Sequence, residues 1–449
     1  MKRRRPPLTV GVFADLPGGL GGGVSFYTRA LVESLIARLP DGVRLVAFVA
    51  RGDADWRRAV HERVAFVEVE RWEVLRGLKK WRDRGDRSVL AFTRTFRGDV
   101  LGGRMAVRHG GRERRILDAV HRSPWPLDVM HFPFQTFTPL PIPTILGLWD
   151  LQHVHLRDLW PRGAAADRDR YYLWSSRLAT RVLLASESAR EDVIRQYGLL
   201  RSSTAVIPVA SPRGLSPPPS AYDVEQVRRK YELPDRFAFY PAITWRHKNH
   251  IRLLSALAEV RRRGAGGLHL VCSGQRGQAF DEIVAHARAV GVVDNAHFLG
   301  HVADMEIRAL YRLAEFCIIP SLFEGAGLPV LEAFDEGCPL AVSRVASIPE
   351  YAADAALYFD PTDEGDIADA MVALAVSAQL RCEMAKRGRA RGATFTWDRV
   401  VESLLDLCGS VAGVPVQADV EEGSFRKDGD RVGEPESSIL NQDRLDRKP

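Results

Sequence analysis

Short runs of apolar and β-branched residues alternate with helix-like segments along most of this chain of 449 residues. Several of these runs lack polar alternation, which is typical of strands buried on both faces of a sheet. Between the runs, apolar residues recur at spacings of three and four, as in 250–262 and 304–314. Strands that alternate with helices build βαβ units around parallel sheets, so we expect an α/β fold. The expected strands are 8–14, 43–50, 64–70, 128–133, 144–150, 181–186, 237–243, 268–274, 297–302, 316–321, 339–343 and 356–360.

The chain is too long for one hydrophobic core, and a proline-rich segment at 208–222 divides it into two halves. We predict two doubly wound, Rossmann-like domains, one at 1–210 and one at 211–395. Ligands of such sheets bind at the carboxyl ends of the strands, and two facing domains would form a ligand cleft. The segment 413–449 is polar and nearly free of aromatic residues, so we expect it to be disordered.

The charge of the chain favours anionic partners. Its formal net charge is +6, which suits nucleotides or an anionic membrane surface. The basic segment 76–115 carries Trp81, Phe92 and Phe96 among its arginines and lysines. It is either an acceptor or membrane-surface patch or a solvated helical excursion, and both interpretations stay open. No nucleic-acid-binding motif accompanies it, so we expect no nucleic-acid partner.

Cysteine usage and the N-terminus indicate a reducing compartment. The five cysteines form no CxxC pair, and Cys272 and Cys317 lie in apolar runs, so we expect buried free thiols. The basic N-terminus is a poor secretory signal because its apolar part is short. No run of about 18 apolar residues occurs, so no transmembrane helix is expected. We predict a cytoplasmic protein, with peripheral contact at the inner face of the membrane as an alternative.

A glycine run at 16–35, "LPGGLGGGVSFYTRALVESL", follows the first expected strand and opens a helix. Backbone N–H groups at a helix start bind anions, so this turn suits a phosphate. The dinucleotide fingerprint fails in its spacing, and a Walker A loop is excluded because the chain contains no Gly-Lys pair. The glycines thus indicate close approach of some ligand, or simply a flexible turn.

Two acids flank a glycine-proline turn in the stretch 321–334, "SLFEGAGLPVLEAF". Pro329 suits the first turn of a helix, where its missing N–H costs nothing. Glu332 is then expected in the first helical turn, where the helix dipole stabilises a carboxylate. Glu324 falls in the preceding loop. Both carboxylates would lie at the carboxyl end of a strand, where they could accept hydrogen bonds from sugar or ribose hydroxyls.

Gly325 and Gly327 lie between these acids and would let the backbone pass close to a ligand, with N–H groups free to bind oxygen atoms. The simpler alternative is that Glu332 caps the helix and Glu324 is solvated. That alternative accounts poorly for the glycines and both acids together.

The segment 297–361 resembles the C-terminal signature of the family 4 retaining glycosyltransferases, the group 1 glycosyl transferases. The frame S-x-x-E-G-x-G-L-P-x-x-E-A is complete, and "GCP", "SIPE" with Glu350 and "DAALYFDP" follow it. The resemblance covers roughly residues 8 to 410. Further similar segments are "GGVSFYTRAL", "TILGLWDLQHVHL" (144–156), "ASESAREDVIRQYG" (185–198), "YPAITWRHKNHIRLLSAL" (240–257) and "FTWDRVVESLL" (395–405).

This resemblance implies the GT-B fold, with two Rossmann-like domains facing a cleft and no metal or other cofactor. It implies a nucleotide-sugar co-substrate held mainly by the domain 211–395, an acceptor side formed by 1–210, and a helix at 396–412 that returns to the first domain. The form "WRHKNH" is similar to that of bacterial mannosyltransferases, so GDP-mannose is the first guess for the donor. A glycan or lipid-linked acceptor in bacterial surface polysaccharide synthesis would fit.

Residue roles follow from the same resemblance. When the nucleoside diphosphate leaves the sugar, negative charge develops on it, and fixed cations must stabilise this charge. The resemblance implies that Lys248 contacts the diphosphate. The family's arginine should precede it, but those positions read Ala242, Ile243 and Thr244. Arg246 either substitutes for that arginine or is an exposed helix-start residue.

Glu332 is implied to hold the ribose hydroxyls and Glu324 to orient the donor sugar. Asp150 is kept from a His-Asp pair that touches the donor sugar, whereas Trp149 replaces the histidine. His153 is a further catalytic candidate, although a lone histidine is more often structural. The remaining residues implied at the donor are Gly22, Gly23, Gly325, Ala326, Gly327 and Leu328.

The resemblance favours a front-side retaining mechanism, in which the leaving phosphate accepts the acceptor's proton and no side chain is an obligatory general base. The main alternative is a sugar-nucleotide-binding protein with a decayed catalytic site, because the arginine and histidine are missing. An epimerase or phosphorylase of the same fold is less consistent with the complete glutamate frame.

Overall fold

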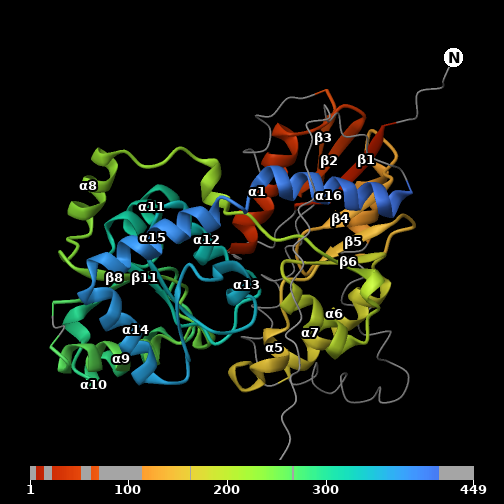
Figure 1. Ribbon diagram of the computed structural model, residues 1–449. Helices are drawn as coiled ribbons and strands as arrows, with labels where there is room; N and C mark the ends of the chain where they lie inside the picture. The colour runs from red at the N-terminus through yellow and green to blue at the C-terminus, as the bar shows by residue number, and fades with distance from the viewer. Residues whose placement is uncertain are drawn as a thin grey trace, which may run out of the picture. The chain divides into compact units, whose positions relative to one another are not determined.

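The computed structural model describes residues 7–14, 23–51, 62–69, 114–161, 163–264 and 267–413. Gly22, almost all of the basic segment 76–115, and the segment 413–449 beyond its first residue lie outside these ranges. The described residues form two parallel sheets flanked by helices (Figure 1). The predicted α/β fold with two doubly wound sheets is confirmed.

The first lobe, residues 8–206, contains a seven-stranded sheet in the order β3-β2-β1-β4-β5-β6-β7. Every neighbouring pair is parallel, and the order reverses between β1 and β4. β7 was not among the expected strands. The strands are β1 Leu8–Phe13, β2 Val43–Ala50, β3 Val64–Val69, β4 Val129–Phe132, β5 Thr144–Gly147, β6 Arg181–Leu184 and β7 Thr204–Val206.

The second lobe, residues 221–392, contains a six-stranded parallel sheet in the order β10-β9-β8-β11-β12-β13. The order reverses between β8 and β11, so the carboxyl ends of these two strands mark the switch point where ligands of such sheets bind. Cys272 and Cys317 are free and buried in β9 and β11, as expected. The strands are β8 Phe237–Pro241, β9 His269–Ser273, β10 Ala296–Phe298, β11 Phe316–Ile319, β12 Leu340–Ser343 and β13 Leu357–Phe359.

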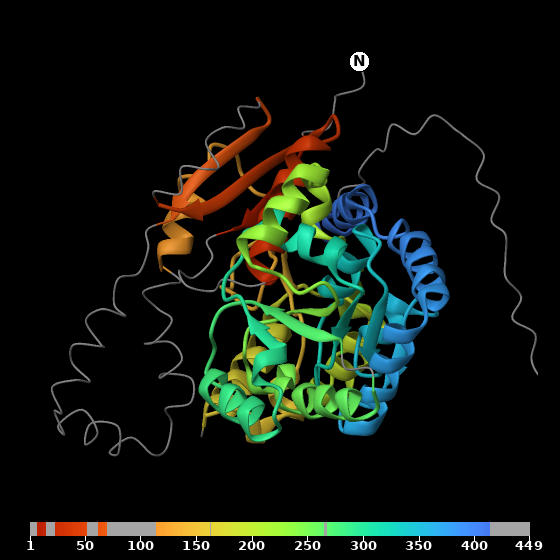
Figure 2. The same cartoon turned by 90° about the vertical axis from the view of Figure 1, so that its left-hand side faces the viewer.

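Helices cover both faces of the second sheet (Figures 1 and 2). α9, α10 and α14 lie on one face, and α11, α12 and α15 lie on the other. The helices of the first lobe include α1 Gly23–Ala37, α5 Gln152–His155, α6 Ala164–Leu178 and α7 Glu187–Tyr197, and residues 114–121 are helical as well. Those of the second lobe are α8 Ala221–Lys230, α9 His250–Arg262, α10 Phe280–Ala289, α11 Asp304–Leu313, α12 Leu328–Asp335, α13 Ile348–Ala352, α14 Glu364–Val376 and α15 Ala378–Gly392.

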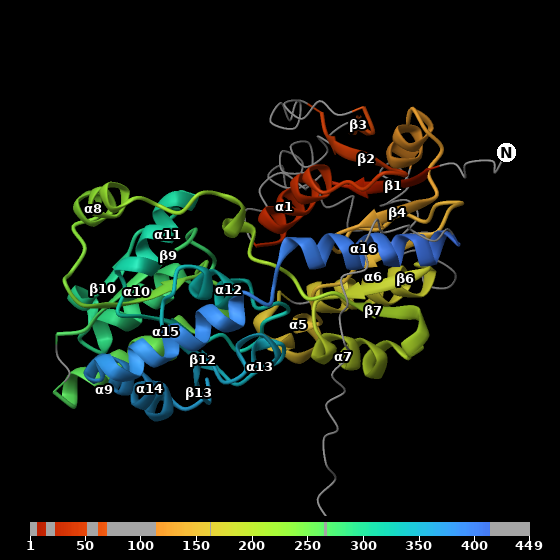
Figure 3. The same ribbon diagram turned by 45° about the horizontal axis from the view of Figure 1, so that its top comes forward.

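The last described helix, α16, Trp397–Ala412, packs against α1 and β4 of the first lobe (Figure 3). Thr396 begins it by accepting a hydrogen bond from the Arg399 N–H group, which is typical of a helix N-cap. The indole of Trp397 donates to the Ser211 carbonyl at 2.9 Å. A segment distant in sequence thereby returns to the first sheet and also holds the start of the linker.

α13 joins the two lobes by hydrogen bonds. The carboxylate of Glu350 accepts the N–H groups of Glu187 at 2.7 Å and Ser188 at 2.5 Å, at the start of α7. The neighbouring Tyr351 hydroxyl donates to the Ala185 carbonyl at 2.7 Å. Unpaired N–H groups at a helix start favour a carboxylate partner, so Glu350 caps a helix of the other lobe. Within the described ranges, no helix combines the length and hydrophobicity needed to cross a bilayer.

Candidate active site

Lys248 and Glu324 meet at the switch point of the second sheet. Lys248 ends the short 3-10 helix η5, Arg246–Lys248, which follows β8, and Glu324 lies in the loop after β11. The Nζ atom of Lys248 lies 2.6 Å from Oε1 of Glu324, and the two side chains are only 16% and 11% exposed. The structure therefore brings together the two residues that the sequence implied for the diphosphate and the donor sugar.

Asp150 adds a third charged group from the first lobe. A Cβ added to Gly325 would lie 2.6 Å from the Trp149 carbonyl oxygen and 2.8 Å from Asp150 Oδ2. Burial raises the pKa of Asp150, and Glu324 adds to this rise while Lys248 opposes it. The three charged groups thus act on one another where the two lobes touch, and Gly325 allows this close approach because it has no side chain.

The N-terminus of α12 also lies here. α1 begins at Gly23, and a Cβ added there would lie 2.9 Å from the Cδ1 atom of Leu328, which begins α12. Pro329 lies in the first turn of α12, as predicted. Helix N-termini attract anions through their free N–H groups and the helix dipole. The start of α12, which the first described residue of α1 contacts, therefore offers such groups to an anion such as a diphosphate.

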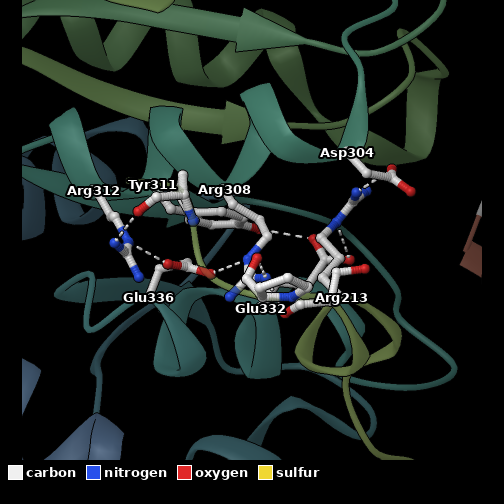
Figure 4. A network of polar contacts seen from close by, with 10 residues as sticks. Arg213, Asp304, Arg308, Tyr311, Arg312, Glu332 and Glu336 are labelled. Carbon is white, nitrogen blue, oxygen red and sulfur yellow. Dashed lines mark hydrogen bonds and ion pairs between the residues drawn. The ribbon is translucent and has the colours of Figure 1, made fainter. Parts of the chain in front are cut away.

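Glu332 lies in the second turn of α12, and the first turn carries no acidic residue. The prediction that the dipole of the first turn holds it was therefore wrong. Instead, Oε1 of Glu332 lies 2.9 Å from Nε of Arg213, and the Tyr311 hydroxyl donates to Oε2 at 3.1 Å (Figure 4). The residue is 8% exposed. A buried carboxylate needs such partners, since an unpaired one would lose much solvation energy.

The glycines of the turn serve protein packing. A Cβ on Gly327 would lie 2.6 Å from the ring of Tyr351. The space beside the α-carbon of Gly325 is filled by Trp149 and Asp150. Protein atoms therefore fill the space beside both α-carbons, and the predicted approach of the backbone N–H groups to a ligand stays a prediction. Ala326 and Leu328 are buried as well, at 8% and 7% exposure.

Arg246 does not join the pair formed by Lys248 and Glu324. Its Nη2 atom donates to Oε2 of Glu282 on α10 at 3.0 Å, and its side chain is 58% exposed. This exposed ion pair is of a kind that contributes little energy. Arg246 could therefore turn toward an anion, but in this structure it points to the neighbouring helix.

His153 is buried among aromatic rings of the first lobe. Its ring lies edge-on to Tyr172 at 5.0 Å and to Trp160 at 6.3 Å, and Nε2 lies 3.7 Å from Oδ1 of Asp169. Burial lowers the pKa of His153 to about 4, and Arg168 adds to this effect. The described contacts of His153 do not include Lys248 or Glu324, so its placement favours a structural role.

His155, two residues further on, is the histidine of this motif that reaches the second lobe. Its ring stacks on Phe323, with centroids 5.2 Å apart and planes 16° apart. Its Nε2 atom lies 2.7 Å from Oδ2 of Asp192. The sequence did not single out His155. The one-turn helix α5 directs His153 and His155 in different directions, and their spacing does not show which of the two contacts Phe323, the residue before Glu324.

Trp149, at the position of the family's histidine, is part of the core. Its indole donates to the Pro133 carbonyl at 3.0 Å and lies edge-on to Tyr27, 4.8 Å away. Tyr27 in turn contacts Trp397 of α16. The tryptophan therefore links β5 to α1 and α16 and leaves Asp150 as the polar group of that pair.

Arg213 and Tyr311, the partners of Glu332, were also missed. Arg213 belongs to the proline-rich segment, which the sequence indicated only as a break, and Tyr311 looked like an apolar position of α11. The sequence signal of Arg213 is that it stands alone among prolines, glycines and serines. Tyr311 has no such signal. Among the residues the structure describes, no group of three or more His, Cys, Asp or Glu side chains is arranged to hold a metal ion.

Comparison with solved structures shows the fold. Sucrose-phosphate synthase from Thermosynechococcus elongatus superposes with a TM-score of 0.67 and 17% identity, over 90% of this chain and 99% of that chain. HepE from Anabaena, solved with UDP and glucose, gives a TM-score of 0.66 and 14% identity, over 90% of this chain and 100% of that one. At these identities the likeness shows the fold alone. The protein has the GT-B fold, as expected.

The sequence comparisons give the family. Residues 223–391 match the model of the group 1 glycosyl transferases. The O-antigen chain mannosyltransferase B of Escherichia coli is 29% identical over 221 residues, which is 48% of this chain and 57% of that protein. The match thus spans just over half of that relative. The resemblance indicated by the motifs is confirmed: the segment 223–391 is a group 1 glycosyl transferase domain.

Proposed function

We propose that this protein is a retaining, metal-independent glycosyltransferase that moves a sugar from a nucleotide-sugar donor to a glycan or lipid-linked acceptor. The observation that carries the proposal is the cluster of Lys248, Glu324 and Asp150 beside the N-terminus of α12. A lysine and a helix dipole supply fixed positive charge for a departing diphosphate. The two carboxylates can accept hydrogen bonds from the hydroxyls of the transferred sugar.

Retention is proposed to proceed on one face of the sugar. The leaving phosphate takes the proton of the acceptor hydroxyl while the new bond forms on the face that the phosphate leaves. In this scheme Lys248 stabilises the charge on the departing phosphate, Glu324 and Asp150 orient the sugar, and Glu332 binds the ribose. His153 has no part in it, because its ring is enclosed in the first lobe.

Mannose is the proposed sugar and GDP-mannose the proposed donor. The support is the mannosyltransferase name of the Escherichia coli relative and the similar "WRHKNH" segment. The same relative acts on an O-antigen chain by name, so bacterial surface polysaccharide synthesis at the inner face of the membrane is the proposed setting. The HepE structure, which holds UDP and glucose, makes UDP-sugars the second class to test.

A thermal-shift screen of GDP-, UDP- and ADP-sugars with the purified full chain tests the donor, because a ligand that binds the native state raises the unfolding temperature. The stabilising donor is then incubated with glycan acceptors, with and without EDTA, and the anomeric configuration of the product is determined by NMR. Retention with full activity in EDTA supports the proposal. An inverted product, a metal requirement or a trapped covalent adduct on Glu324 would contradict it.

The alternative, a sugar-nucleotide-binding protein without catalysis, is favoured by one observation. Arg246, the only nearby substitute for the family's arginine in sequence, pairs with Glu282 instead of approaching Lys248. This alternative predicts donor binding in the thermal-shift screen but no donor hydrolysis and no transfer to any acceptor. Measurable hydrolysis of the donor at high protein concentration would exclude it.

A further inference from the structure

A linker arginine connects the helices on both sides of the candidate donor site. Arg213 lies in the 3-10 helix η4, Pro212–Leu215, between the two sheets, and its side chain is only 11% exposed. Its Nε atom pairs with Glu332 at 2.9 Å, and its Nη1 atom pairs with Asp304 at the start of α11 (Figure 4). Its guanidinium carbon lies 5.2 Å from the ring centroid of Phe26.

These contacts place one guanidinium between α1 and α12. Phe26 is in the first turn of α1, whose N-terminal Gly23 touches Leu328 at the start of α12. Glu332 is one turn further along α12. The cation thus packs on an aromatic face, which is a favourable contact for arginine, while it pairs with the carboxylate that is proposed to bind the ribose.

The carboxylate of Glu332 is held on both sides. Nε of Arg213 forms an ion pair with Oε1, and the Tyr311 hydroxyl donates to Oε2 and also lies 3.3 Å from the Pro329 carbonyl oxygen. Each carboxylate oxygen can accept a second hydrogen bond, so both still offer one acceptor site to a pair of neighbouring hydroxyls. A side chain with both oxygens fixed loses little rotational freedom when such a pair binds.

Arg213 is itself held firmly by the linker. Arg308 of α11 donates to the carbonyls of Ser216 at 2.6 Å and Pro217 at 2.8 Å, and it pairs with Glu336. Arg312 donates to the Pro219 carbonyl at 2.9 Å. The residues that follow η4 are therefore tied to α11, and the position of Arg213 is set by the same helix that carries Tyr311.

We propose that Arg213 is a positioning residue that holds Glu332 in the orientation needed to bind the 2′- and 3′-hydroxyls of the donor's ribose. The inference rests on the proposed function, since it takes Glu332 as the ribose ligand. It predicts that removing the guanidinium weakens recognition of the ribose diol, and that it leaves recognition of the phosphates largely as it was.

A thermodynamic cycle between the residue and the diol tests this inference. Binding of GDP and of 2′,3′-dideoxy-GDP is measured by calorimetry for the wild-type protein and Arg213→Ala, with the UDP pair run in parallel. We expect loss of the diol to weaken binding to the wild-type protein about tenfold or more, because the hydrogen bonds that the two hydroxyls donate to the Glu332 carboxylate are then lost. In Arg213→Ala the same loss should weaken binding less than about threefold.

Two further variants complete the design. Arg229→Ala removes an exposed arginine of α8 that pairs with Glu225, and it leaves both the ties between the linker and α11 and the contact between Arg213 and Glu332 intact, so the discrimination should equal that of the wild-type protein. Arg213→Lys retains a cation and serves in the cycle if the alanine variant does not fold. It should discriminate between the two ligands less well than the wild-type protein.

Three outcomes would overturn the inference. Full diol discrimination in both Arg213 variants would show that Glu332 needs no help from the arginine. The Arg213 variants could bind GDP less tightly relative to GMP and still distinguish GDP from dideoxy-GDP as the wild-type protein does. Arg213 would then contact the phosphates instead of positioning Glu332. Absence of diol discrimination in the wild-type protein would reject the ribose role of Glu332 within the proposed function and the inference with it.

Discussion

The ammonium of Lys248 lies 2.6 Å from the carboxylate of Glu324, and both side chains are largely buried. Each group neutralises the other as long as no donor is present. A diphosphate that approaches Lys248 must therefore compete with Glu324, and a sugar hydroxyl that approaches Glu324 must compete with Lys248. Donor binding is expected to loosen this pair and leave both groups in contact with different parts of one ligand.

Removing one member of the pair should harm both stability and donor binding. In Lys248→Met the carboxylate of Glu324 loses its partner in a largely buried place, and breaking such a pair costs about 3–5 kcal/mol when burial is complete. We expect a somewhat smaller loss in urea unfolding and a loss of nearly all transfer activity. The double variant Lys248→Met/Glu324→Gln should recover much of the stability but no activity. Recovery of activity in the double variant would contradict the assigned roles.

Glu332→Ala should weaken donor binding and remove most of the activity while the fold is kept. The change removes the proposed ribose ligand and also one of the two carboxylate partners of Arg213, which keeps its ion pair with Asp304. Circular dichroism checks the fold, and calorimetry with the stabilising nucleotide sugar checks affinity. Unchanged affinity and turnover in Glu332→Ala and in Lys248→Ala would reject the site as described.

Gly325→Ala should disturb the contact between the lobes. Its new methyl group would lie 2.6 Å from the Trp149 carbonyl oxygen, and overpacking of this kind costs about 1–3 kcal/mol. We expect lower activity and a lower unfolding temperature, with circular dichroism unchanged. Gly267→Ala is the matched control, because the nearest atom to a Cβ there is the end of the Arg236 side chain at 3.8 Å. Equal behaviour of the two variants would show that the contact at Gly325 is dispensable.

His153 should make the protein less stable in mild acid. Burial lowers the pKa of His153 to about 4, whereas an unfolded histidine titrates near about 6.5. Between these values the unfolded chain binds the extra proton, so the contribution of His153 is complete above about pH 6.5 and is lost as the pH falls toward 4. His153→Phe should therefore flatten the dependence of unfolding free energy on pH in this window. The variant should also keep its transfer activity at pH 7.5, and a large loss there would return His153 to the list of catalytic groups.

The fold could be predicted from the sequence because the strands of a parallel sheet covered by helices are apolar on both faces. Strands such as β8 and β11 are buried on both faces and appear as unbroken apolar runs, and the glutamate frame is complete around Pro329. The short strand β7 was not predicted, because its apolar residues run directly into the proline-rich segment that was interpreted as the break between the two halves.

The missed parts of the site depend on contacts between distant segments. Glu332 meets Arg213 across the linker, and His155 meets Phe323 across the two lobes, and no local pattern encodes either contact. Glu332 lies just beyond the first turn because α12 begins one residue before Pro329. The position of the proline also leaves open which partner holds a carboxylate further along the helix. The packing of Gly325 and Gly327 against Asp150 and Tyr351 could not be predicted either, because these neighbours lie in other parts of the chain.

The capping of α7 by Glu350 limits how the two halves of the chain can be exchanged. The carboxylate and the two N–H groups that it accepts are separated by more than 160 positions in sequence. A chimera that takes the segment 223–391 from a relative without an acid at this position would leave the N–H groups of Glu187 and Ser188 without this acceptor, and only the Ser186 side chain would still cap α7. Swapping the halves to change donor specificity therefore requires that Glu350 and the start of α7 come from the same parent protein.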